Sequence, residues 1–64
     1  MCLSNVYRGS IGDNNLLLNN VRRLECKDGV VTLTDIMERQ MTIEGDILMV
    51  DLIANQVIIK PKED

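Results

Sequence analysis

The sequence predicts an all-β protein: a single small domain of six or seven short antiparallel strands that form a compact barrel or two packed sheets. Apolar residues occur in short runs rather than at helical spacing, and clusters of Gly, Asn and Asp separate the runs. The runs recur about every ten residues, as in all-β domains. Because 64 residues suffice for one domain only, we expect the domain to span residues 1–60 and a charged, solvated tail to span 61–64.

The first half of the chain contains two strand-like segments separated by a loop. Residues 2–7, CLSNVY, alternate in a way that places Val6 and Tyr7 on opposite faces of a strand. Residues 9–15, GSIGDNN, have the composition of a loop. Residues 16–26, LLLNNVRRLEC, are expected to form two short strands or one bent strand, because Asn19 and Asn20 tolerate positive φ angles.

The second half is predicted to be a series of hairpins. KDG at 27–29 indicates a tight turn, since Gly29 adopts positive φ without steric cost. Strands are expected at 30–34, 37–43, 47–53 and 56–60, with turns at 35–36, 44–46 and 54–55. Pro61 has no backbone N–H to donate and is expected to end the last strand.

Composition excludes several classes of protein. The longest apolar stretch, ILMVDLIA, contains Asp51 and is much shorter than the ~20 residues that span a bilayer, so a cytoplasmic protein with reduced thiols is expected. The net charge of −3 is mixed along the chain and does not favour nucleic-acid binding. Leu, Ile and Val total 21 residues, more than one face of a small sheet can bury, which favours a homodimer.

Catalysis is poorly supported by the residues present. The chain has no histidine, so it lacks both the usual partner of a nucleophilic Ser or Cys and the usual general base near neutral pH. Carboxylates are numerous, but Asp46 and Asp51 have the positions of turn and edge residues. We therefore expect a protein that is not an enzyme.

Cys2 is the main candidate for chemistry. Its thiolate would be a soft metal ligand, and the terminal amine on Met1, the Cys2 amide nitrogen and the Cys2 sulfur can close adjacent chelate rings. A planar N,N,S donor set suits Ni(II) better than Zn(II), which prefers tetrahedral sites. Without Met1, an N,S chelate on Cys2 remains. One protomer supplies too few strong donors, so two Cys2 residues of a symmetric dimer would complete the site.

Other interpretations of these residues remain open. Cys2 can be a small hydrophobic strand residue, and core packing beside Leu24 accounts for Cys26. Small β-barrels often bind RNA, although Tyr7 is the only aromatic residue available for stacking. A dimerisation module without a ligand is the third alternative.

Four segments of the chain resemble one family. MCL-x-x-VY at the N-terminus, VTLTD at 31–35, IEGDI at 43–47 and VDLIANQVII at 50–59 are similar to CooT-type proteins, small nickel-binding accessory proteins of carbon monoxide dehydrogenase maturation. Members of this family have also been labelled predicted RNA-binding proteins. The resemblance implies an all-β homodimer that binds one Ni(II) through the N-terminal cysteine, here Cys2, for delivery to a nickel enzyme such as carbon monoxide dehydrogenase.

Overall fold

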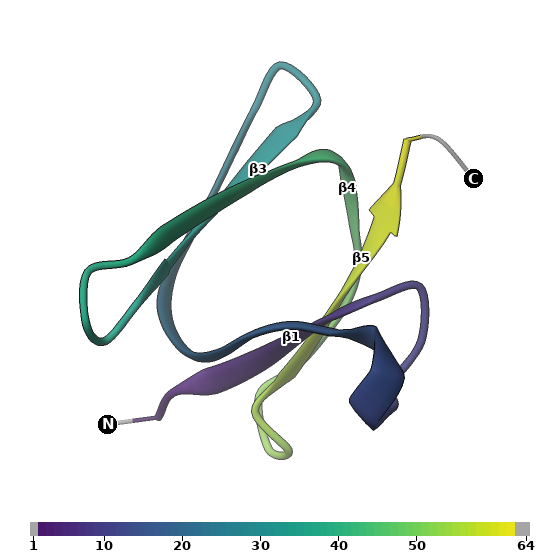
Figure 1. Ribbon diagram of the computed structural model, residues 1–64. Helices are drawn as coiled ribbons and strands as arrows, with labels where there is room; N and C mark the ends of the chain where they lie inside the picture. The colour runs from purple at the N-terminus through teal and green to yellow at the C-terminus, as the bar shows by residue number, and fades with distance from the viewer. Residues whose placement is uncertain (1, 63–64) are drawn as a thin grey trace.

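The computed structural model describes residues 2–62 and shows a five-stranded closed barrel (Figure 1). The strands are β1 (Ser4–Arg8), β2 (Leu16–Lys27), β3 (Val30–Asp35), β4 (Gln40–Asp51) and β5 (Gln56–Pro61), with a short 3₁₀ turn, η1 (Asp13–Asn15), before β2. The all-β class is therefore confirmed. The strands number five rather than six or seven, because β2 and β4 are each twelve residues long.

The strands follow one another around the barrel in sequence order. Each consecutive pair is antiparallel, and β1 pairs with β5 in parallel to close the ring. The expectation of antiparallel strands holds for all pairs except this one. The reason is geometric: in an up-and-down barrel with an odd number of strands, the first and last strands run in the same direction.

β2 is a single bent strand, one of the two forms that the sequence predicted for residues 16–26. It pairs with β1 up to Val21 and with β3 from Val21 onward, and its register shifts on both sides of that residue. Asn20 adopts a φ of 55°, as its position between two apolar runs suggested. Register shifts of this kind are β-bulges, which bend a strand without ending it. One curved strand therefore serves two neighbours on different sides of the barrel.

β4 turns a similar corner at Gly45, in the segment predicted to be a turn. Residues 40–44 pair with β3 and residues 45–51 pair with β5, with a further register shift between Ile47 and Met49. A Cβ atom at position 45 would lie 3.0 Å from the Cα of Pro61 and closer still to the carbonyl oxygen of Lys60. Glycine therefore allows β4 and β5 to approach closely at the corner.

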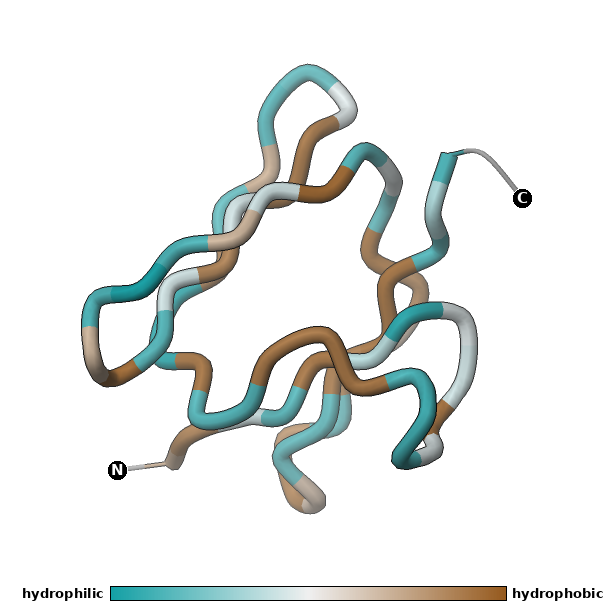
Figure 2. Tube along the Cα trace, viewed as in Figure 1, coloured by the Kyte–Doolittle hydropathy of each residue, from teal (hydrophilic) through white to brown (hydrophobic). Residues whose placement is uncertain are grey.

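The barrel encloses a small aliphatic core. Its buried members come from β1, β2, β3 and β5: Val6, Val21, Val31, Leu33, Val57 and Ile59. Tyr7 is buried too but does not belong to this cluster, so both faces of β1 are covered. Hydrophobic residues lie along the strands, and the turn between β2 and β3 is hydrophilic (Figure 2).

Two aspartates organise the hairpin turns on either side of β4. The buried Asp35 carboxylate accepts hydrogen bonds from the backbone N–H groups of Met37 (2.9 Å) and Arg39 (2.8 Å) and from the Arg39 guanidinium (2.7 Å). These bonds hold residues 36–39 in the turn, so β4 begins at Gln40 rather than at Met37. In the next turn, the Asp51 carboxylate accepts hydrogen bonds from the N–H groups of Ile53 and Ala54.

The ordered sheet extends slightly beyond residue 60. Pro61 is the last residue of β5, where it is buried opposite Gly45, and the Lys62 N–H donates to the Glu44 carbonyl at 2.9 Å. Pro61 thus ends the strand, as predicted, but it belongs to the barrel rather than to a solvated tail. Residues 63 and 64 lie outside the described residues.

Candidate metal centre at the N-terminus

Cys2 lies two residues before β1 and is exposed. The start of β1 is held on both sides. Ser4 pairs with Val21 of β2, and the Asn5 N–H donates to the carbonyl of Asn55, just before β5, at 2.9 Å. The thiol therefore sits next to an anchored strand, in a position that an incoming ion can reach.

Charged side chains on the adjacent part of β2 form ion pairs. Arg22 pairs with Glu38 of the β3–β4 turn at 2.6 Å, and Arg23 pairs with Glu25 at 3.0 Å. Both pairs are substantially exposed, so water screens them. Arg22 and Arg23 thus already have carboxylate partners within the chain.

Residues 2–62 of one chain do not provide a complete set of side-chain ligands for a metal ion. Among residues 2–62, no group of three or more His, Cys, Asp or Glu side chains is placed to hold a metal ion. Met1, the other predicted site residue, lies outside the described residues. Two exposed thiols, Cys2 and Cys26, are the soft donors among the described residues, and the Cys2 sulfur together with backbone nitrogen is the donor set that the sequence suggested.

Cys26 is exposed, so the prediction that it packs in the core is wrong. It lies opposite Val31, which is fully buried, near the β2–β3 turn. β1 pairs with β2 only as far as Val21, so β3 alone flanks the end of β2 that carries Cys26. Strand alternation placed Cys26 on the side of Leu24, but it could not show where the neighbouring strand stops.

The described residues do not present an exposed aromatic side chain on which RNA bases could stack. Tyr7, the only aromatic residue in the sequence, is 8% exposed and packs within the fold. Single-stranded nucleic acid is usually held by exposed aromatic side chains in a basic groove. The structure thus offers no support for the RNA-binding alternative.

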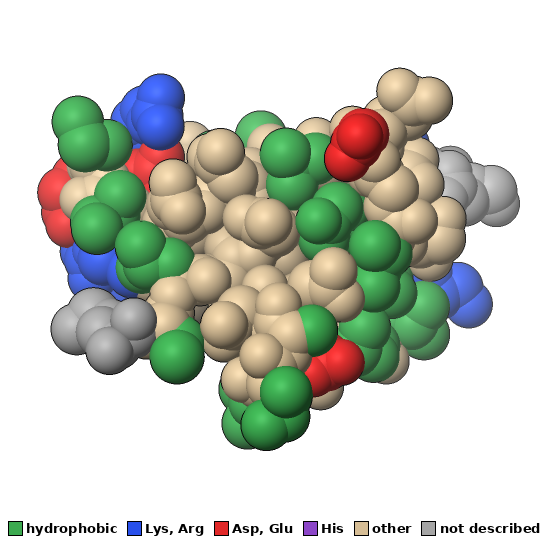
Figure 3. All heavy atoms as spheres, turned by 90° about the horizontal axis from the view of Figure 1, so that it is seen from below, with side chains coloured by type: hydrophobic (Ala, Val, Ile, Leu, Met, Phe, Trp, Pro, Cys, Tyr) green, Lys and Arg blue, Asp and Glu red, His purple; other side chains and the backbone are tan. Residues whose placement is uncertain are grey.

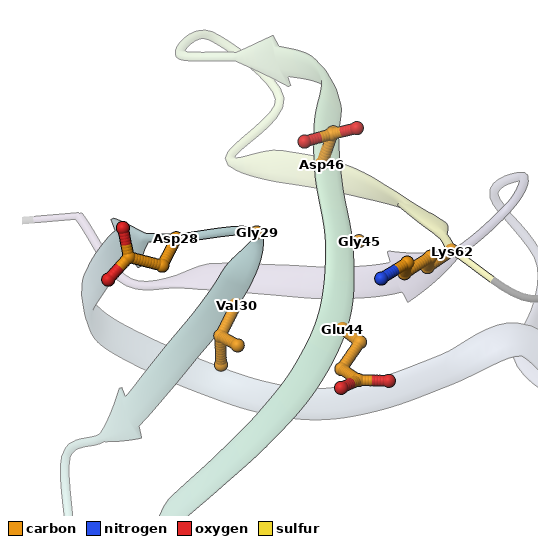
Figure 4. A pocket seen from close by; sticks show the side chains of 7 residues that line it. All are labelled: Asp28, Gly29, Val30, Glu44, Gly45, Asp46 and Lys62. Atoms are coloured by element: carbon orange, nitrogen blue, oxygen red, sulfur yellow. The ribbon is translucent and has the colours of Figure 1, made fainter.

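Sequence reasoning missed a shallow pocket at the corner of β4. It is lined by Asp28, Gly29 and Val30 of the β2–β3 hairpin, by Glu44, Gly45 and Asp46 of β4, and by Lys62 (Figure 4). The predicted turns at 27–29 and 44–46 were the only signals for it. Their spatial proximity depends on the pairing of β3 with β4, which places Val30 opposite Glu44.

The described part of the chain contains no helix of the length and apolar character needed to cross a membrane.

Comparison with family models identifies one family. A family model described as "CO dehydrogenase accessory protein CooT" matches residues 1–60. The chain is similar in fold to a crystal structure described as "putative CooT from Carboxydothermus hydrogenoformans", with a TM-score of 0.82 over 97% of this chain and 100% of the other. The two are 19% identical, so this likeness concerns the fold. No curated protein matches the chain.

Proposed function

Because the chain belongs to the CooT family of CO dehydrogenase accessory proteins, we propose that it binds Ni(II) through Cys2 in a homodimer and delivers the ion to a nickel enzyme. The family consists of accessory proteins and not of catalytic enzymes. Carbon monoxide dehydrogenase is the proposed client. The exposed thiol at the anchored start of β1 is the observation that carries the proposal.

The donor chemistry supports nickel as the cargo. A thiolate beside backbone nitrogens provides N and S donors in one plane, and Ni(II) accepts tetragonal geometry. The terminal amine, on Met1 or on Cys2 once Met1 is removed, adds a further nitrogen. Each protomer would contribute the same donors, so a twofold axis close to Cys2 would complete a four-coordinate site.

The location of the thiol also suits delivery. Cys2 precedes the barrel and is not enclosed by it, so the ligands of a client could approach the ion while the sheet stays folded. A carrier has to release its ion, and a site at the exposed Cys2 gives a partner direct access to it.

Calorimetric titration of Ni(II) into the wild type, Cys2→Ala and Cys26→Ala tests the site. We expect one ion per two chains in the wild type and a loss of affinity of about 100-fold or more in Cys2→Ala, equivalent to about 2.7 kcal/mol. Cys26→Ala is the matched control, because it also removes an exposed thiol, and its affinity should stay within about twofold of the wild type. Equal affinity in wild type and Cys2→Ala would remove Cys2 from the site.

Nickel affinity should also depend on pH. A cysteine binds a metal as the thiolate, so binding releases protons and weakens as the pH falls. Titrations at one pH in buffers of different ionisation enthalpy would measure the number of protons released. We expect proton release in the wild type and Cys26→Ala, and its loss in Cys2→Ala. Proton release that persists in Cys2→Ala would point to other ligands.

A further inference from the structure

One edge of β4 lacks a partner strand. The pairing of β4 with β3 ends at Glu44, followed by a last hydrogen bond from the Gly45 N–H to the Gly29 carbonyl at 2.9 Å. From Asp46 to Asp51, β4 pairs only with β5, and no other strand among residues 2–62 lies along its second side. We call residues 46–51 on this side the β4 edge. Such an edge presents backbone N–H and C=O groups that can pair with another chain.

The β4 edge is apolar between two carboxylates. Ile47, Leu48 and Val50 are 38%, 57% and 50% exposed, respectively. Asp46 and Asp51 lie at the two ends of the edge. In the space-filling view, hydrophobic side chains gather in a band along one side of the molecule and at its lower tip (Figure 3). The side chains of the edge thus provide an apolar surface beside the unpaired backbone.

A second unpaired edge, on β2, has a different character. Residues 22–27 pair with β3 but have no β1 partner beyond Val21. They include four exposed charged side chains: Arg22, Arg23, Glu25 and Lys27. Charged side chains on an edge strand oppose pairing with another chain. The β4 edge instead carries apolar side chains between its two terminal aspartates. Of the two unpaired edges, it is therefore the one suited to pairing with another chain.

The pocket at the corner of β4 lies at the beginning of this edge. Asp28, Glu44 and Asp46 line it with carboxylates that point away from one another, and the Lys62 side chain extends toward β4 between Gly45 and Glu44 (Figure 4). With Asp51 at the other end, the surroundings of the edge carry more negative than positive charge. A ligand that complements them would bear positive charge at its ends and apolar groups between.

We propose that the β4 edge binds an extended segment of a partner protein in which apolar residues lie between basic residues. The segment would add a strand beside β4, pairing with the backbone of Met49, Val50 and Asp51 after the register shift at Leu48. Its apolar side chains would cover Leu48 and Val50. A basic side chain at one end would lie near Asp46, and one at the other end would lie near Asp51.

A second copy of this chain is a poorer occupant. If two β4 edges paired antiparallel about a twofold axis between Leu48 and Met49, Asp46 would face Asp51 of the second copy, and like charges opposite each other are destabilising. The β4 and β5 strands of both copies would also lie between the two Cys2 residues, so that about five strand spacings of ~4.8 Å along the sheet would separate them. That separation prevents a shared ion, so this second argument rests on the proposed function.

The test uses the whole protein and a synthetic peptide that alternates valine and threonine between two terminal lysines. In ¹⁵N-resolved NMR titrations, we expect saturable shifts of the backbone amides of residues 46–51 that are larger than those of residues 22–27. The same peptide with terminal glutamates should bind at least tenfold more weakly. A peptide N-methylated on the amides that face the protein should not bind, because it cannot pair with the edge.

Two leucine variants provide a matched comparison. Leu48→Lys places a charge on the edge and should weaken peptide binding about tenfold, whereas Leu52→Lys alters the adjacent turn, where Leu52 is 79% exposed, and should bind as the wild type does. Cys2→Ala should also bind the peptide normally, which separates this proposal from the nickel site. Unshifted amides at 46–51, or equal binding of the N-methylated peptide, would overturn the proposal. So would a lower molecular mass of Leu48→Lys without peptide, which would identify a second copy as the occupant.

Discussion

At the scale of single residues, Asp35 shows how one buried carboxylate can define a turn. It is the only charged residue that is fully buried among residues 2–62. Its burial alone would raise the pKa of the carboxyl, but the hydrogen bonds from the Arg39 N–H, the Arg39 guanidinium and the Met37 N–H outweigh burial and lower the pKa below its usual 3.8. The same three bonds close the β3–β4 turn, so the charge and the turn depend on each other.

This lowered pKa predicts an acid-sensitive fold. The unfolded chain takes up a proton at Asp35 before the folded chain does, so the Asp35 contribution to stability is complete above about pH 5 and is lost as the pH falls through the native pKa. Asp35→Asn should be less stable than the wild type at pH 7 and should lose less stability between pH 7 and pH 3. Urea unfolding at both pH values measures this. Asp46→Asn, at an exposed position, should behave as the wild type does; a wild-type pH dependence in Asp35→Asn would contradict the argument.

At the scale of the elements, the two long strands decide the shape of the barrel. β2 and β4 each pair with one neighbour along one half and with another neighbour along the other half. Asn20, with positive φ, lies near the bend of β2, and Gly45, which closely approaches β5, lies at the bend of β4. These bends allow five strands to close a barrel, and they leave the half-strand edges of β2 and β4 without partners.

Adding a side chain at position 45, the corner of β4, should destabilise the fold. In Gly45→Ala, the new Cβ would overlap the backbone of Lys60 and Pro61, which would force β4 away from β5 and cost about 1–3 kcal/mol of stability. Gly12→Ala is the control, because its Cβ would meet only the Asn15 side chain, at an ordinary 3.6 Å. Urea unfolding of both variants measures the difference. Equal stabilities would show that the corner can relax without cost.

At the scale of the whole molecule, a small core coexists with a considerable apolar surface. Six buried aliphatic side chains form the core, while Leu52 and Ile53 at the β4–β5 turn are 79% and 94% exposed. A domain of this size buries only a modest fraction of its surface and gains stability from self-association. The proposed homodimer would supply that stability in addition to the second Cys2.

A homodimer predicts that thermal stability depends on protein concentration. Association stabilises the folded state by mass action, so Tm should rise by about 5 °C or more over a hundredfold increase in concentration. Scanning calorimetry measures the rise, and light scattering at the same concentrations, with and without Ni(II), measures the mass. A constant Tm with the mass of one chain would contradict the dimer.

Much of the local structure followed from the sequence alone. The spacing of apolar runs, Gly29 in its tight turn, Asn20 between two runs and Pro61 at the end of a strand each reflect a preference that a residue carries with it. Cys2 was proposed as a metal ligand from its position in the chain, and this assignment stays a prediction. The resemblance to the CooT family also depended on short sequence segments, and the family model supports it.

Only the tertiary structure decided how many strands there are and which residues are covered. A bulge and a reversal look alike in a sequence, since both need residues that tolerate unusual φ angles, and the difference depends on which strands pair on either side. Cys26 is exposed because β1 pairs no further than Val21, and the β4 edge exists because β3 begins at Val30. Strand propensity depends on the residues of the segment itself. Burial and unpaired edges depend on which strands lie beside that segment in the sheet.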